Sequence, residues 1–129
     1  MRKLPYDPQK DFRPISGVTR VPMILAVPAD SPHKSVAEFV AWARSRGDKV
    51  NYGSTGVGTS PHLLMEELAA NAKVQLNHVP FKGNADLQQA LLGGHVMAQS
   101  DASDWDKFVD GGQMRLLVTF GENRTKRWP

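Results

Sequence analysis

The hydrophobic and polar positions of this chain follow two different periods in turn. Between residues 35 and 45 the apolar side chains recur at i, i+3, i+4 and i+7, which is typical of an amphipathic helix. Ser35 and Glu38 have the spacing of a capping box at its start. Residues Val74–Val79 instead alternate apolar and polar side chains, which favours a strand.

The same reasoning predicts the remaining elements. Helices are expected over Ser35–Ser45 (ended by Gly47), Pro61–Ala72, from a capping Asn84 to Gly93, and over Asp104–Val109. Strands are expected over Ile15–Val18, Val21–Val27, Val50–Tyr52, Val74–Val79, Val96–Gln99 and Arg115–Phe120. Residues 1–14 and 121–129 are read as an extended leading segment and a polar tail.

Strands that alternate with helices indicate a three-layer α/β domain with a mostly parallel sheet. Ligands of such sheets bind beyond the carboxyl ends of the strands. Three polar connections leave strand ends here, over Gly53–Ser60, Pro80–Asn84 and Ser100–Asp104. We expect them to converge on one edge of the sheet.

Composition narrows the class of protein. With 129 residues and 40% hydrophobic side chains, the chain is expected to form one domain with a real core. The absence of cysteine excludes disulfides and thiolate metal sites. The net charge is +3, but the positive residues are dispersed and cluster only at Arg124, Lys126 and Arg127. Because phosphate tracking needs a basic face, we do not expect a nucleic-acid partner.

The segment from Asn51 to His62 carries the strongest chemical signal. It reads Asn-Tyr-Gly-Ser-Thr-Gly-Val-Gly-Thr-Ser-Pro-His and leads directly into a predicted helix. Its glycines permit backbone conformations and close approaches that a Cβ forbids. Ser60 is expected to cap the helix, and Pro61 fits its first turn. Hydroxyl and N–H groups at a helix start favour an anion such as a carboxylate or a phosphate.

Nucleotide-binding motifs do not fit this loop. Gly53 and Gly58 have the spacing of a P-loop, but Thr59 stands where that motif requires lysine. The dinucleotide fingerprint lacks its third glycine, and His78 rather than an acid lies about twenty residues on.

A small α/β hydrolase remains an alternative. Ser54 or Ser60 could meet His62 and Asp101 in a Ser-His-Asp arrangement, although Gly-x-Ser-x-Gly is absent around Ser54. The four histidines lie far apart and without paired ligand spacing, so neither a metal nor another cofactor is expected. His78, within a strand pattern, is interpreted as a hydrogen-bonded structural residue.

The remaining chemistry is that of binding. A carboxylate would accept hydrogen bonds from the loop. Asp101 either accepts from an amine or hydroxyl of the ligand or serves as a turn residue, and Lys82 faces either an anion or solvent. The candidate binding residues are Gly53, Ser54, Thr55, Gly56, Gly58, Thr59, Ser60, His62, Lys82 and Asp101.

Four segments also carry a family resemblance: Tyr6–Phe12, Asn51–His62, His78–Gly83 and Leu91–Val96. In this order they resemble the TctC/Bug family of tripartite tricarboxylate transporter substrate-binding proteins, over essentially the whole chain. The resemblance implies a periplasmic, non-enzymatic protein with a type II periplasmic-binding-protein fold. Such a protein captures a small organic carboxylate between two domains and passes it to membrane permease subunits.

The resemblance also assigns residues. It implies that Gly53–Ser60 holds a ligand carboxylate, often with bridging water, and that the acid near the ligand is Asp101. Gln99 and Ser100 depart from the family, which has a more apolar pair there. Because family members are longer, residues 1–129 would be the second domain alone. One lobe offers half a cleft, so weak or undetectable ligand binding is expected, and the bare face would favour self-association.

Overall fold

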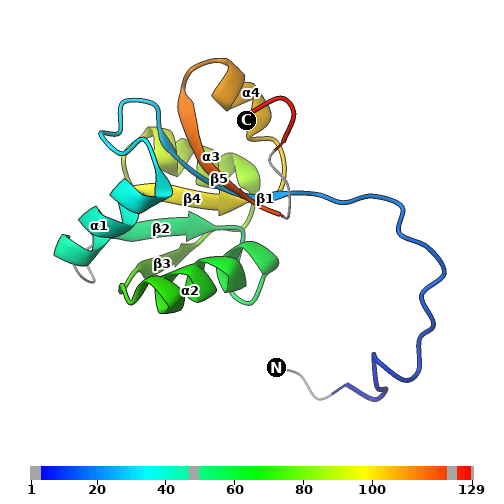
Figure 1. Cartoon of the computed structure of the whole chain (residues 1–129). Helices are drawn as coiled ribbons and strands as arrows, with labels where there is room; N and C mark the ends of the chain where they lie inside the picture. The colour runs from blue at the N-terminus through cyan, green and yellow to red at the C-terminus, as the bar shows by residue number, and fades with distance from the viewer. Residues whose placement is uncertain (1–3, 47–49, 122–124, 129) are drawn as a thin grey trace.

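A five-stranded sheet with helices on both faces forms this protein, seen in a computed structural model that describes residues 4–46, 50–121 and 125–128 (Figure 1). The predicted three-layer α/β arrangement is confirmed. In chain order the elements are β1 (Met23–Pro28), α1 (Val36–Arg46), β2 (Asn51–Ser54), α2 (Ser60–Ala72), β3 (Asn77–Pro80), α3 (Asn84–Leu92), β4 (Ala98–Asp101), α4 (Asp106–Asp110) and β5 (Met114–Phe120).

The strand order is β3-β2-β4-β1-β5. Strand β2 pairs in parallel with β3 and β4, whereas β1 pairs antiparallel with both β4 and β5. The predicted mostly parallel sheet is confirmed in that β2, β3, β4 and β5 share one direction; the sheet is mixed, because β1 alone among the described strands is reversed. Hydrophobic periodicity shows which residues are buried and carries no information about strand direction.

One face of the sheet packs against α1 and α2. Its core combines side chains of β1, β2 and β4 with residues from both helices, namely Leu25, Val27, Phe39, Ala43, Val50, Tyr52, Met65 and Ala98. Phe39 and Ala43 are members of the predicted amphipathic stripe, which is why α1 lies on this face.

The other face is covered by α3, α4 and the C-terminal residues 125–128. Leu91, Val96 and Met114 form one cluster there, and Ile24 and Trp105 belong to a second. The two clusters bury the opposite side chains of the same strands, as strand alternation requires.

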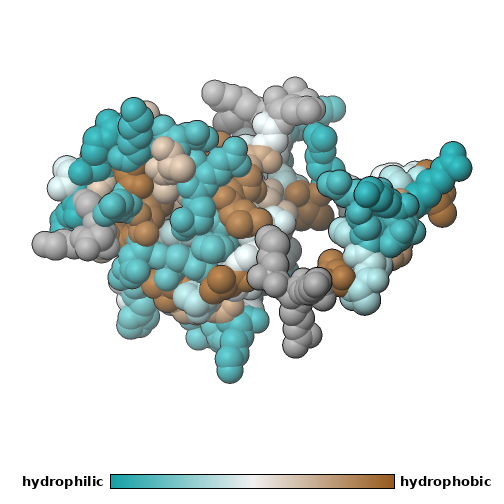
Figure 2. Space-filling model, turned by 90° about the horizontal axis from the view of Figure 1, so that it is seen from below, coloured by the Kyte–Doolittle hydropathy of each residue, from teal (hydrophilic) through white to brown (hydrophobic). Residues whose placement is uncertain are grey.

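Residues 15–18 do not form the predicted strand. Ile15 is 100% exposed and Val18 is 96% exposed, and β1 begins only at Met23. β-Branched side chains favour a strand only where a partner strand pairs with them. The described part of the segment before β1, residues 4–22, instead extends away from the domain as an arm (Figures 1 and 2).

Three other elements differ from their predicted boundaries. Strand β3 starts at Asn77 rather than Val74, and β4 is displaced by two residues to Ala98–Asp101. Helix α4 starts at Asp106, because the backbone of Asp104 has φ of 61° and interrupts the helix.

Of the three predicted N-caps, that of α1 is confirmed, and those of α2 and α3 lie one residue earlier than predicted. Glu38 donates its N–H to Ser35 Oγ at 3.2 Å, so the predicted cap of α1 is confirmed. Thr59 rather than Ser60 is the N-cap of α2, and Gly83 rather than Asn84 is that of α3. Gly47, the predicted end of α1, lies outside the described residues. No helix in the described ranges has the length and apolar character needed to cross a bilayer.

Candidate functional site

The three polar connections meet at the carboxyl edge of β2, β3 and β4, as predicted. The N–H of Phe81, after β3, donates to Ser54 O at the end of β2 at 2.9 Å. Asn84 Nδ2 donates to Ser103 Oγ at 2.7 Å, which joins the connections that follow β3 and β4. Candidate residues from distant parts of the chain therefore lie along one edge.

The loop between β2 and α2 depends on two glycines with positive φ. Gly56 has φ of 126° and Gly58 has φ of 78°, values that other residues adopt only with strain. Thr59 Oγ1 donates to Gly56 O at 2.8 Å, so the Thr59 side chain does not cap α2. The first-turn N–H groups of α2, those of Ser60 and His62 because Pro61 has none, therefore donate no bond to the N-cap side chain.

Gly53 serves a different purpose, which is close packing. A Cβ built on Gly53 would lie 2.4 Å from Leu87 Cδ1 and 2.9 Å from Phe81 Cε2. The sheet can approach α3 this closely only at a glycine. Gly53 thus positions the loop and contributes no side chain to it.

Ser54 is bound to His78. Its Oγ lies 2.7 Å from His78 Nε2 and also contacts Gly56 O at 3.3 Å, and the Ser54 side chain is fully buried. The interpretation of His78 as a hydrogen-bonded residue of a strand is confirmed. Burial lowers the pKa of His78, the nearby His62 lowers it further, and Glu66 opposes both effects.

His62 bonds within its own loop and helix. Gly58 N–H donates to His62 Nδ1 at 3.0 Å, and His62 Nε2 lies 3.7 Å from Glu66 Oε1. The alternative pairing of Ser54 or Ser60 with His62 is not favoured, because His62 Nδ1 accepts from Gly58 and Ser54 Oγ lies beside His78 instead.

Tyr52 belongs to the same polar cluster as His62, Glu66 and His78. Its hydroxyl donates to Glu66 Oε1 at 2.7 Å, and its ring lies 5.0 Å from that of His78. Burial raises the pKa of Tyr52 above its ordinary value, and the hydrogen bond to Glu66 and that group's charge raise it further. Tyr52 therefore stays a neutral donor.

Asp101 is buried at the end of β4 and lies on the strand next to the loop. Its Oδ1 accepts the N–H of Ala102 at 2.6 Å, while Oδ2 has no hydrogen-bond partner among the described residues. Burial raises the pKa of Asp101, against the bonds from Ala102 and Ser103. Lys82, after β3, is exposed at the same edge.

Gln99 and Ser100, which precede Asp101 on β4, are also buried without hydrogen-bond partners among the described residues. Within the described chain, both amide atoms of Gln99 and the hydroxyl of Ser100 make no hydrogen bond. These are the two positions where the resemblance leads one to expect apolar residues. The core of β4 is therefore unusually polar.

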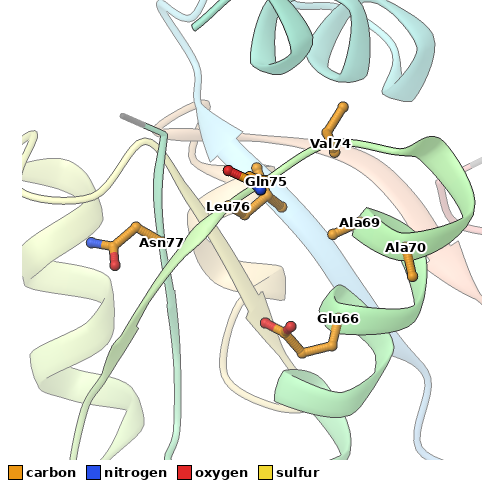
Figure 3. A pocket seen from close by; sticks show the side chains of 7 residues that line it. All are labelled: Glu66, Ala69, Ala70, Val74, Gln75, Leu76 and Asn77. Atoms are coloured by element: carbon orange, nitrogen blue, oxygen red, sulfur yellow. The ribbon is translucent and has the colours of Figure 1, made fainter. Parts of the chain in front are cut away.

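A pocket of about 610 Å³ lies between α2 and the chain that leads into β3. Figure 3 shows its lining, with Glu66, Ala69 and Ala70 on α2 facing Gln75 and Leu76. Glu66 is the charged residue of this lining, so the pocket is not suited to an anion. None of the residues of the loop Gly53–Ser60 lines it.

The sequence did not reveal Tyr52, Glu66 and His78 as members of one cluster. They come from three elements, and only the i, i+4 spacing of His62 and Glu66 on α2 could have indicated part of it. No group of three or more His, Cys, Asp or Glu side chains in the described residues is arranged to hold a metal ion.

Comparison with known proteins identifies the family. Residues 1–129 match the model of the tripartite tricarboxylate transporter family receptor, TctC. A Cupriavidus necator protein named "UPF0065 protein in gbd 5'region" is 46% identical over 127 residues, which is 98% of this chain and 39% of that protein. The chain thus spans about two-fifths of the length of this relative.

Solved structures agree with this match. An R. palustris protein with adipate is 32% identical with a TM-score of 0.81, over 95% of this chain and 42% of that one. MatC from Rhodopseudomonas palustris with bound malate is 29% identical with a TM-score of 0.80, over the same shares. From its sequence along the whole length and from its fold, this chain belongs to the tripartite tricarboxylate transporter receptor (TctC) family.

Proposed function

We propose that this chain is one lobe of a solute-binding protein that captures a small organic carboxylate for a tripartite tricarboxylate-type transporter. The ligand lies between this lobe, the second domain, and a facing lobe. The whole protein acts in the periplasm and delivers the ligand to membrane permease subunits.

The observation that carries the proposal is the loop from Gly53 to Ser60 at the carboxyl edge. Its hydroxyl groups, and the first-turn N–H groups of α2 that the N-cap side chain leaves unbonded, are the donors that a carboxylate needs. Relatives that share this fold were solved with adipate and with malate, both dicarboxylates. The shared ligand chemistry supports a carboxylate here.

Asp101 and Lys82 border the loop and have opposite charges. The unpartnered Oδ2 of Asp101 is suited to accept from a ligand hydroxyl or from a water beside the carboxylate. Lys82 is exposed at the same edge and adds positive charge. Selection among carboxylates would depend on Asp101, and attraction of the anion on Lys82.

A hydrolase that uses Ser54 is less compatible with the geometry. Ser54 is fully buried and its Oγ is bound between His78 and Gly56 O, so a substrate carbonyl cannot approach it in this conformation. We expect no turnover of simple esters. The hydrolysis rates measured with the wild type and with Ser54→Ala should both equal the rate without protein.

The test compares adipate with 1,6-hexanediol, which has the same carbon chain and no carboxylates. Ligand-observed NMR on this chain should detect saturable adipate binding, with a Kd on the order of millimolar because one lobe supplies half the contacts. The diol should not bind. Equal binding of diol and adipate would contradict the proposal.

Two glycines give a matched pair of variants. Gly58 in the loop and Gly94 at the opposite edge have φ of 78° and 73°, and a Cβ would meet nothing within 4 Å at either. Gly58→Ala should weaken adipate binding, whereas Gly94→Ala should impose the same backbone strain and leave binding unchanged. Identical effects of both variants would place the site elsewhere.

A further inference from the structure

Two imidazole rings stack directly beside the glycine-rich loop. His62 of α2 and His78 of β3 have ring centroids 4.0 Å apart, with an angle of 23° between the ring planes. Only 17% of the His62 side chain is exposed, and His78 is half-buried.

Each ring is hydrogen-bonded to a different part of the loop. His78 bonds Ser54, where the loop leaves β2, and His62 accepts the N–H of Gly58, four residues further on. Because Gly58 donates to Nδ1, that nitrogen carries no proton, and the neutral ring must be the Nε2–H tautomer. This Nε2–H points toward Glu66.

Among the described residues named above as contacts of the pair, Glu66 is the charged side chain. From α2 that group is Glu66, and from β2 it is the neutral phenol of Tyr52, which donates to Glu66. Glu66 accepts from Tyr52 and faces His62, so a single carboxylate would have to compensate two imidazolium charges.

We propose that His62 and His78 are positioning residues that hold the loop Gly53–Ser60 in its ligand-accepting conformation while both rings are neutral, and that protonation of His62, whose Nδ1 accepts the N–H of Gly58, releases it. The link to ligand binding rests on the proposed function. An imidazolium at position 62 would direct a second N–H at the N–H of Gly58. Two protonated rings would also repel each other at 4.0 Å.

The proposal predicts the sign of the pH dependence. Ligand binding should weaken as the pH falls from 8 to 6, because the loop is released. If an imidazolium contacted the carboxylate directly, binding would instead strengthen over that range. The lowered pKa of His78 agrees with a ring that the fold keeps neutral.

The first experiment measures adipate affinity of the whole chain between pH 6.0 and 8.0, where carboxyl groups with an ordinary pKa of about 4 stay ionised. The wild type should lose about two-fold or more in affinity toward pH 6. His62→Asn and His78→Gln keep an amide near the bonded nitrogen and do not titrate, so they should bind with a flatter pH profile. His62→Ala, which removes the acceptor, should bind weakly at every pH.

His95 provides the control, because it is exposed and follows α3 at the opposite edge. His95→Gln should retain the wild-type pH profile. An increase in wild-type affinity toward pH 6, or an unchanged profile in His62→Asn, would overturn the proposal.

A second readout needs no ligand. Two-dimensional imidazole NMR at pH 8 should show the Nε2–H tautomer of His62, and the amide resonance of Gly58 should shift as the pH is lowered from 8 to 6. An Nδ1–H tautomer, or a Gly58 resonance that does not respond, would refute the positioning role even if adipate binds. Conversely, loss of adipate binding at every pH would refute the proposed function and leave this readout to decide the positioning role.

Discussion

The hydroxyl of Tyr52 donates a 2.7 Å hydrogen bond to Oε1 of Glu66, across the packing of β2 against α2. The Tyr52 side chain is fully buried, whereas that of Glu66 is 52% exposed. The bond gives a buried phenol its acceptor and directs the same carboxylate toward His62.

Tyr52→Phe should lower the free energy of unfolding by about 1 kcal/mol, the usual net value of such a bond. Glu66→Gln keeps an acceptor oxygen for the phenol and should cost less. Urea denaturation measures both, with the exposed Tyr6→Phe as control. A Tyr52→Phe protein as stable as the wild type would show that the bond contributes nothing.

Gly53→Ala should be strongly destabilising. The added methyl group would approach Leu87 Cδ1 to 2.4 Å and must displace α3 or Phe81, at a cost of about 1–3 kcal/mol. Gly83→Ala is the matched control, because a Cβ there meets nothing within 4 Å and its φ of −168° suits any residue. Thermal unfolding of both variants would decide the matter. Equal melting temperatures would contradict the packing role of Gly53.

Two buried glutamines, Gln99 and Gln88, differ in whether their side-chain amides are hydrogen-bonded. Gln99 is buried with both amide atoms unbonded, whereas Gln88, also buried, donates to Asp104 O at 3.0 Å. Gln99→Met should therefore leave stability unchanged or raise it by about 1 kcal/mol, while Gln88→Met should lower it by a similar amount. Denaturant midpoints compare the two. A marked loss in Gln99→Met would mean that the amide has a partner, such as a buried water.

Asp101 should make stability fall as the pH rises. Its pKa in the folded protein lies above the ordinary value of 3.8, so the folded chain binds more protons than the unfolded chain between these two pKa values. The stabilisation is complete below pH 3.8 and is lost as the pH rises through the raised pKa. Asp101→Asn keeps Oδ1 as acceptor for Ala102 and removes this dependence.

The difference in unfolding free energy between Asp101→Asn and the wild type should therefore grow in favour of the variant from pH 4 to pH 7. The exposed Asp30→Asn, which is not among the groups that shift the pKa of Asp101, serves as control and should show little change. A difference that is constant with pH would contradict the burial of an ionisable Asp101.

The sequence predicted the layers of the fold and the edge at which the loops converge. Helical spacing in α1 and α2 and short apolar strands are local signals, and the connections that follow parallel strands must share one edge. The reversed direction of β1 and the irregular backbone at Ile15 were not predictable in this way, because both depend on which strands are neighbours.

The candidate site could also be predicted only in part. The glycine-rich loop is contiguous in sequence, so its composition could be interpreted. Ser54 and His78 are 24 residues apart in the sequence, and Tyr52 and Glu66 are 14 residues apart, so each contact joins two different elements. No local spacing encodes those pairings, and for this reason the hydrolase alternative considered His62, and not His78, as a partner of Ser54.

The central claim is that the loop at the carboxyl edge binds a carboxylate. The most direct measurement is an amide NMR titration of the chain with adipate at pH 8, at constant ionic strength. Saturable shifts should be confined to residues 53–62 and to the neighbourhood of Asp101. Shifts that instead map to the pocket of Glu66, Ala69 and Gln75, or the absence of any saturable shift, would contradict the account.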